Sequence, residues 1–134
     1  MAKESNIKNS QGITKPHGGT LKELLVAPSF RDHLKDESLN LRSWDLTDRQ
    51  TCDIEILLNG GFSPLQGFLG KQEYESVCET MRLSNGCLWP IPITLDVTKE
   101  FATNISSGDR IALRHPEGMV LAVMSVQEIW EPDF

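Results

Sequence analysis

The stretch Leu58-Asn59-Gly60-Gly61-Phe62-Ser63-Pro64-Leu65-Gln66-Gly67-Phe68-Leu69 decides how this chain folds. Three glycines, a proline and an asparagine are interleaved here with two phenylalanines and three leucines. Gly and Asn tolerate positive φ, and Pro fixes φ near about −65°. Because large apolar side chains accompany these turn formers, the sequence predicts a shaped turn that is buried in the protein and not a flexible linker.

Helices are predicted on both sides of this turn. Before it, Thr47 and Gln50 have the spacing of a capping box, so a helix should begin there and end at residues 59–61, with a left-handed residue. The buried face of this helix is expected to hold Ile54, Leu57 and Leu58. After the turn, apolar residues at i, i+3, i+4 and i+7 predict a helix over residues 71–81. Its buried face should hold Tyr74, Val77, Cys78 and Met81.

The N-terminal part of the chain is expected to be less regular. Residues 1–15 are polar and predict a mobile arm. Thr20 could cap a short helix that Pro28 ends, and a second short helix is predicted over residues 29–37. The first of these would bury Leu21, Leu24 and Leu25.

The last third of the chain changes to the period of β-strands. Residues 88–97 alternate apolar and other positions, and their two prolines place that strand at an edge of a sheet or make it irregular. Residues 110–114 predict a second strand, and the turn at 116–118 returns the chain into residues 119–130. Because residues 119–124 are apolar on both faces, that strand is expected to be central. Helices precede strands, so the fold class is α+β, with a small twisted sheet or partial barrel.

Composition and charge limit the classes of function. The chain has 134 residues, room for one domain, and a net charge of −6, which gives no electrostatic footprint for nucleic acid. Its three cysteines (Cys52, Cys78 and Cys87) form no C-x-x-C pair and suit a reducing, cytoplasmic environment. Neither a signal peptide nor a membrane span is indicated, so no membrane partner is expected.

Candidate catalytic and ligand-binding residues all have a more ordinary interpretation. The three histidines have no metal-ligand spacing and are expected to be surface or packing residues; they are His17, His33 and His115. The Gly70-Lys71-Gln72 sequence lacks both the earlier Gly and the Ser/Thr of a phosphate loop, which makes Lys71 an early-helix surface residue. The carboxylates near one helix start are expected to be capping and surface residues; they are Asp45, Asp48, Asp53 and Glu55. Ser63 lacks the Gly-x-Ser-x-Gly elbow of a hydrolase. We therefore assign no catalytic, cofactor-binding or metal-binding residue.

Several segments of the chain resemble a known enzyme family. They are residues 16–19, 44–55, 58–69, 82–86, 88–96 and 129–132, together with Tyr74. In these the chain resembles the N-terminal region of sulfate adenylyltransferase (ATP sulfurylase), most of all the fungal-type enzymes, from about residue 16 to its end. The resemblance implies a PUA-like domain over residues 16–134, a small β-barrel with flanking helices that packs against a separate nucleotidyltransferase domain.

The resemblance also implies what the chain does not do. The family forms adenosine 5′-phosphosulfate and pyrophosphate from sulfate and Mg-ATP, in sulfate assimilation. Its Gln-x-Arg-Asn and His-x-x-His motifs do not occur in this sequence. We therefore expect a domain that is inactive alone and holds no cofactor, truncated at its C-terminal end, with unpaired strand edges and an exposed apolar patch where the catalytic domain would sit.

Other roles remain open from the sequence. The main alternative is a stand-alone PUA-like binding module for RNA or for a protein, although the charge disfavours RNA. A second is a subunit that docks on a full-length enzyme. The resemblance implies that the full-length protein is a homo-oligomer.

Overall fold

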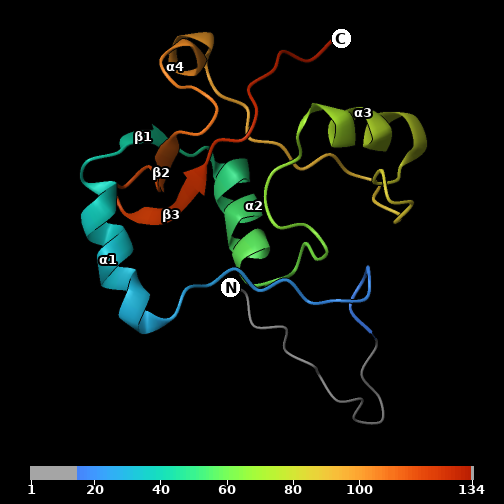
Figure 1. The fold of residues 1–134 in the computed structure, drawn as a ribbon, viewed down its shortest axis with the longest axis horizontal. Coiled ribbons are helices and arrows are strands. Elements are labelled where there is room, and N and C mark those ends of the chain that lie inside the picture. Colours follow the sequence, from blue (N-terminus) through green and yellow to red (C-terminus); the bar gives the residue numbers. More distant parts are fainter. Residues whose placement is uncertain (1–14, 134) are drawn as a thin grey trace.

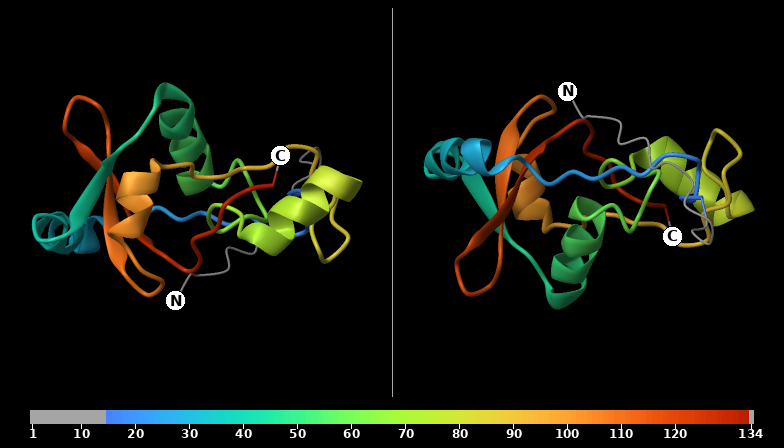
Figure 2. Two further views of the ribbon diagram at one scale, coloured as in Figure 1. Left: turned by 90° about the horizontal axis from the view of Figure 1, so that it is seen from above. Right: turned by 90° about the horizontal axis from the view of Figure 1, so that it is seen from below.

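The computed structural model describes residues 15–133, so the arm predicted over residues 1–15 lies almost wholly outside the described residues. The helices and strands in chain order are α1 (Pro28–Ser38), β1 (Arg42–Asp45), α2 (Asp48–Leu58), α3 (Lys71–Thr80), α4 (Lys99–Thr103), β2 (Arg110–Arg114) and β3 (Val120–Ser125). The sheet, α1 and α4 lie at one end of the molecule, and α3 lies at the other (Figures 1 and 2).

The sheet is mixed and open. Its order is β1-β2-β3, with β1 parallel and β3 antiparallel to β2. The α+β class and the small mixed sheet with flanking helices are confirmed, whereas the described residues do not close a barrel. The prediction that residues 119–124 form a central strand is wrong. The central strand is β2, whose Ile111, Ala112 and Leu113 are at most 1% exposed, because the unpredicted β1 pairs with its other side.

The capping box is confirmed at the start of α2. The backbone N–H of Gln50 donates to the Thr47 hydroxyl at 3.2 Å, and the Gln50 side-chain oxygen accepts from the Thr47 N–H at 3.0 Å. At the other end of the helix, Gly60 has φ +85°, as the left-handed stop required. Ile54 and Leu57 are buried as predicted, and Leu58 is half-buried.

The short helix predicted over residues 21–25 is wrong, whereas the next one is confirmed as α1. Pro28 does not end a helix but begins one, where its missing N–H costs nothing. The preceding segment is non-helical because its backbone bonds the turn at residues 58–69, the central turn: the Leu24 N–H donates to the Leu58 carbonyl at 2.9 Å. The Lys22 N–H donates to the Ser63 hydroxyl at 2.8 Å.

Helix α3 is confirmed, but the prediction of its buried face is only partly right. Val77 is 1% exposed and Tyr74 is half-buried. Cys78 is exposed, and Met81, 53% exposed, ends the helix with a left-handed φ of 56°. Val77 is thus the one fully buried side chain of the predicted face, and the face of α3 that packs against the described residues is narrower than the sequence period predicted.

Residues 88–97 form no regular strand in the described chain. Leu88 makes one isolated bridge to Arg82, and the residues from 89 to the start of α4 belong to no assigned strand. The prolines at 90 and 92 explain the irregularity at the start, since they cannot donate to a ladder. The short α4 was not predicted, although Thr98 caps it by accepting from the Phe101 N–H at 3.2 Å.

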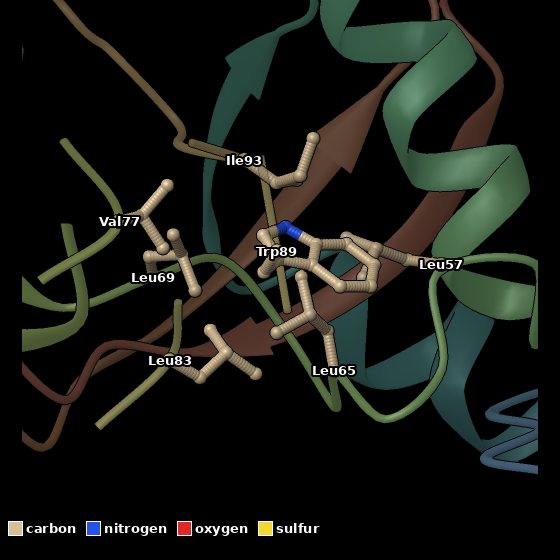
Figure 3. Packing of buried hydrophobic residues seen from close by; sticks show 7 residues of the cluster. All are labelled: Leu57, Leu65, Leu69, Val77, Leu83, Trp89 and Ile93. Atoms are coloured by element: carbon tan, nitrogen blue, oxygen red, sulfur yellow. The ribbon is translucent and has the colours of Figure 1, made fainter. Parts of the chain in front are cut away.

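Two apolar clusters form the core. One gathers around Trp89 on the α3 side, as Figure 3 shows, and consists of Leu57, Leu65, Leu69, Val77, Leu83, Trp89 and Ile93. The other lies between α2 and the sheet and consists of Leu46, Ile54, Ile111, Leu113 and Val126. Phe68, from the central turn, packs against both clusters and so joins them.

Candidate functional site

The central turn is architectural, as predicted. Leu65 and Leu69 are each 8% exposed, and the Ser63 hydroxyl donates to the Gly60 carbonyl at 2.6 Å, which uses its proton inside the turn. Lys71 is exposed at the start of α3, and its N–H donates to the Glu128 carboxylate at 3.2 Å. The N-terminus of α3 therefore already faces a carboxylate of this chain.

The carboxylates near α2 take structural and surface positions. Asp53 accepts from Arg49 at 2.8 Å, one helical turn away, and Arg49 also pairs with Asp96. The other three predicted side chains, Asp45, Asp48 and Glu55, are exposed. An acid–base pair needs two carboxylates in contrasting environments. Of these contacts, the Arg49–Asp96 ion pair is the one that links α2 to the segment before α4.

The three histidines lie in different surroundings. His33 packs edge-on against Phe30 at 5.4 Å, and His115 accepts the Glu117 N–H at 3.1 Å in the β2–β3 turn. His17 lies against the Trp89 ring, 5.9 Å between ring centres. His17 also lines a hollow in the surface.

That hollow is an apolar groove of about 250 Å³. It is lined by His17, Phe62, Leu88, Trp89, Pro90, Ile91 and Ile93. The Nε2 of His17 lies 2.5 Å from the Leu88 carbonyl, which fixes the imidazole as one wall. The sequence singled out the Pro-His-Gly-Gly and Trp-Pro-Ile-Pro segments separately, and the fold brings them together here.

Trp89 is a large side chain with an incomplete set of interactions. It is 8% exposed, and its buried indole Nε1 has no hydrogen-bond partner among residues 15–133. Figure 3 shows this nitrogen turned toward Ile93. A buried donor without an acceptor costs about 1–3 kcal/mol, so a group that completes it would be favoured.

A second hollow, of about 340 Å³, lies between α3 and the last described residues. Tyr74 and Trp130 pack in it with ring centres 4.8 Å apart. The neighbouring Cys78 raises the pKa of Tyr74 above its ordinary value, mainly through a side-chain hydrogen bond. The packing of Trp130 on Tyr74 joins the last described residues to α3.

Metal-ligating side chains do not cluster in the described part of the chain. No group of three or more His, Cys, Asp or Glu side chains among residues 15–133 could hold a metal ion. None of the helices in that range is both long and apolar enough to cross a membrane. The chemistry present at the groove is that of packing and of backbone contacts.

The comparison with protein families agrees with this architecture. The model of a family described as "PUA-like domain" matches residues 14–134. The chain therefore belongs to the PUA-like domain family.

Its relatives are more specific. The chain is 51% identical to the sulfate adenylyltransferase of Eremothecium gossypii and 46% identical to that of Saccharomyces cerevisiae, in each case over 88% of this chain and 24% of the relative. A solved structure, "Hexameric APS kinase from Thiobacillus denitrificans", matches with a TM-score of 0.80 and 38% identity over 90% of this chain and 24% of that one. The chain thus spans about a quarter of the length of the relatives it matches.

Proposed function

We propose that this chain is the non-catalytic PUA-like domain of a sulfate adenylyltransferase and serves as a packing partner for the domain that joins ATP to sulfate. The observation that carries the proposal is the match to sulfate adenylyltransferases at up to 51% identity, restricted to about a quarter of their length. The resemblance over residues 44–55 and 58–69 involves capping and turn residues, which supports a role in architecture.

The chemistry of the reaction belongs elsewhere in the longer polypeptide. Sulfate is a poor nucleophile, so adenylyl transfer depends on positioning and on cationic groups that stabilise charge. This chain has a net charge of −6 and lacks the Gln-x-Arg-Asn and His-x-x-His motifs. We therefore assign Mg-ATP to the remaining part of the full-length enzyme and none of its contacts to this chain.

The apolar groove and its rim suit a contact with another domain. At the groove or next to it in the chain, Leu88, Ile91 and Met81 are 49–62% exposed. These side chains lie in the chain between α3 and α4. A domain packed over them would remove apolar surface from water, which is the main source of affinity in such contacts.

Two measurements test this function. The purified chain, given Mg-ATP and sulfate, should release no pyrophosphate above the background without sulfate. Sulfate-dependent turnover would contradict the proposal.

The second measurement is co-expression with the part of the Saccharomyces cerevisiae sulfate adenylyltransferase that this chain does not match. We expect the two to co-purify and the pair to release pyrophosphate, with the unmatched part alone as the control. Failure to associate, together with a salt-dependent shift of RNA by the chain, would favour the binding-module alternative instead. The homo-oligomer and the cytoplasmic location stay predictions.

A further inference from the structure

Cys87 has a histidine at its sulfur. Its Sγ lies 3.3 Å from the Nε2 of His17, although the two residues are 70 positions apart in the chain. The same Nε2 lies 2.5 Å from the Leu88 carbonyl, which is an acceptor only, so the imidazole carries its hydrogen on this nitrogen. The imidazole therefore faces the sulfur as a donor, and a donor at the sulfur stabilises the negative charge of an attacking thiolate.

The fold holds both members of this pair in place. The Cys87 N–H donates to the Asn85 side-chain oxygen at 3.0 Å, and the Cys87 carbonyl accepts the Leu83 N–H at 2.9 Å. The imidazole of His17 packs on the Trp89 ring, with 5.9 Å between ring centres. Cys87 is half-buried, so its thiol is neither sealed in the core nor loose in solvent.

The pair stands at the edge of the apolar groove. His17 and Leu88, the residue after Cys87, both line the groove, whose volume of about 250 Å³ has room for an aliphatic chain of several carbons. The groove wall also holds a polar group that lacks a partner: Trp89 is 8% exposed, and its Nε1 donor has no acceptor among residues 15–133. This nitrogen is turned toward Ile93, which lines the same groove (Figure 3). The site therefore combines a nucleophile, an apolar seat and a donor that suits a carbonyl oxygen.

The other two cysteines lack these features. Cys52 and Cys78 are exposed, and neither bonds a histidine within the part of the chain that the structure describes. Cys78 lies at the second hollow, whose charged lining side chains are Lys71, Glu75, Glu79 and Asp133. Apolar walls bury an aliphatic chain favourably, whereas charged walls lose hydration when such a chain covers them. The chain thus contains its own comparison for Cys87.

We propose that Cys87 is a site of covalent modification by α,β-unsaturated aldehydes or ketones that carry an aliphatic tail, with the tail seated in the groove. The thiolate sulfur attacks the β-carbon and forms a C–S bond, while the electron pair of the C=C bond shifts toward the carbonyl oxygen to give an enolate. The enolate takes a proton from water at its α-carbon, which balances the proton that the thiol lost. The thiol and the unsaturated carbonyl therefore combine into one thioether, with nothing released and no oxidant required.

This inference is independent of the proposed function. Because an adduct would fill the groove that we assign to a domain contact, the test uses the 134-residue chain without another domain. The probes are acrolein and 2-nonenal, which share the reacting group, whereas only 2-nonenal has an aliphatic tail. Peptide mass spectrometry after timed reaction at neutral pH gives a rate for each of the three cysteines.

The unaltered chain gives the first result. With 2-nonenal, Cys87 should react at least about tenfold faster than Cys52 or Cys78. With acrolein, this advantage should be smaller by about threefold or more, because there is no tail to bury.

Matched variants separate the imidazole from the groove. His17→Phe keeps a ring against Trp89 but removes the N–H, so it should slow Cys87 by about tenfold with both probes. Ile91→Ser removes aliphatic surface at a groove position that is 62% exposed, so it should slow the reaction of 2-nonenal by about threefold and leave that of acrolein unchanged. His33→Phe, on α1, is the control and should change neither rate.

Three results overturn the proposal. Equal rates at the three cysteines of the unaltered chain would show that Cys87 is not activated, and this result needs no variant. An unchanged rate at Cys87 in His17→Phe would remove the role of the imidazole. The same preference for Cys87 over Cys52 with both probes would show that the groove does not receive the tail.

Discussion

Gln50 joins three parts of the molecule through one buried amide. Its side-chain oxygen accepts from the Trp44 indole at 3.0 Å and from the Thr47 N–H, and its nitrogen donates to the Asp96 carbonyl at 2.6 Å. Gln50 has 0% exposure, and the three bonds are partly buried. The capping-box spacing predicts the bond to Thr47. The bonds to Trp44 and Asp96 depend on tertiary structure.

Gln50→Leu should lower the free energy of unfolding by about 1–3 kcal/mol, because it removes three partly buried hydrogen bonds. Urea unfolding followed by circular dichroism measures the change. Gln72→Leu, at an exposed position in the first turn of α3, is the matched control and should change stability by less than about 0.5 kcal/mol. A Gln50 variant as stable as the control would show that the amide network adds no net stability.

Gly60→Ala should cost about 1–2 kcal/mol of unfolding free energy. Gly60 has φ +85°, and a Cβ there would lie 3.0 Å from the Leu21 side chain. Gly67→Ala is the control in the same turn, because φ is not positive there and no atom lies within 4 Å of an added Cβ. Thermal unfolding of both variants tests this, and equal losses would mean that the left-handed residue is not what fixes the turn.

At the scale of elements, α3 takes its N-terminal cap from a distant part of the chain. Gly70 precedes the helix and offers no side chain, and the Glu128 carboxylate accepts the Lys71 N–H instead. Gly70 suits this arrangement, since a Cβ there would lie 2.7 Å from the Glu128 carboxylate. The last described segment is therefore coupled to α3 by this cap as well as by Trp130.

Glu128→Ala should destabilise the chain by about 0.5–1 kcal/mol and speed amide exchange in the first turn of α3, because an exposed cap is lost. Glu131→Ala is the control. Glu131 pairs with Lys99 at 3.5 Å with both side chains more than 80% exposed, so its removal should have almost no effect. If exchange in α3 is unchanged in the first variant, the cap does not hold this helix.

Local signals in the sequence predicted α1, α2, α3 and the β2–β3 hairpin, because caps, helical period and turn residues lie within a few positions of one another. The failures involve contacts between distant segments. Strand β1 forms because it pairs with β2, which lies about seventy residues later in the chain. Arg42, for example, pairs with Ile111. Residues 21–25 follow a helical period, yet Leu24 bonds Leu58 instead. The groove could not be predicted from the sequence either, because only the fold brings His17 and Trp89 together.

At the scale of the whole molecule, two clusters share one aromatic side chain. Phe68 contacts both the Trp89 cluster and the cluster between α2 and the sheet. Helix α3 and the sheet lie at opposite ends of the molecule (Figure 2). Cooperative unfolding of the two ends therefore depends on the central turn.

Phe68→Ala should lower stability by about 2–4 kcal/mol and separate the unfolding of the two clusters. Fluorine-labelled tryptophans report on each cluster, Trp89 on one and Trp44 on the other. In the unaltered chain their urea midpoints should coincide, and in the variant they should differ. Phe30→Ala, at a side chain 55% exposed, is the control that should keep them coincident. Coincident midpoints in Phe68→Ala would show that the clusters are coupled by other contacts.

The segment before α1 crosses the molecule from the groove to the far end (Figure 1). It touches the central turn on the way: an added Cβ on Gly18 would lie 2.8 Å from the Pro64 ring, and Leu21 lies against Gly60. The family match begins at residue 14, just before this segment. These residues therefore lie within the matched domain. Because the two positions are in contact, we expect substitutions at Gly18 and in the central turn to occur together among members of the family.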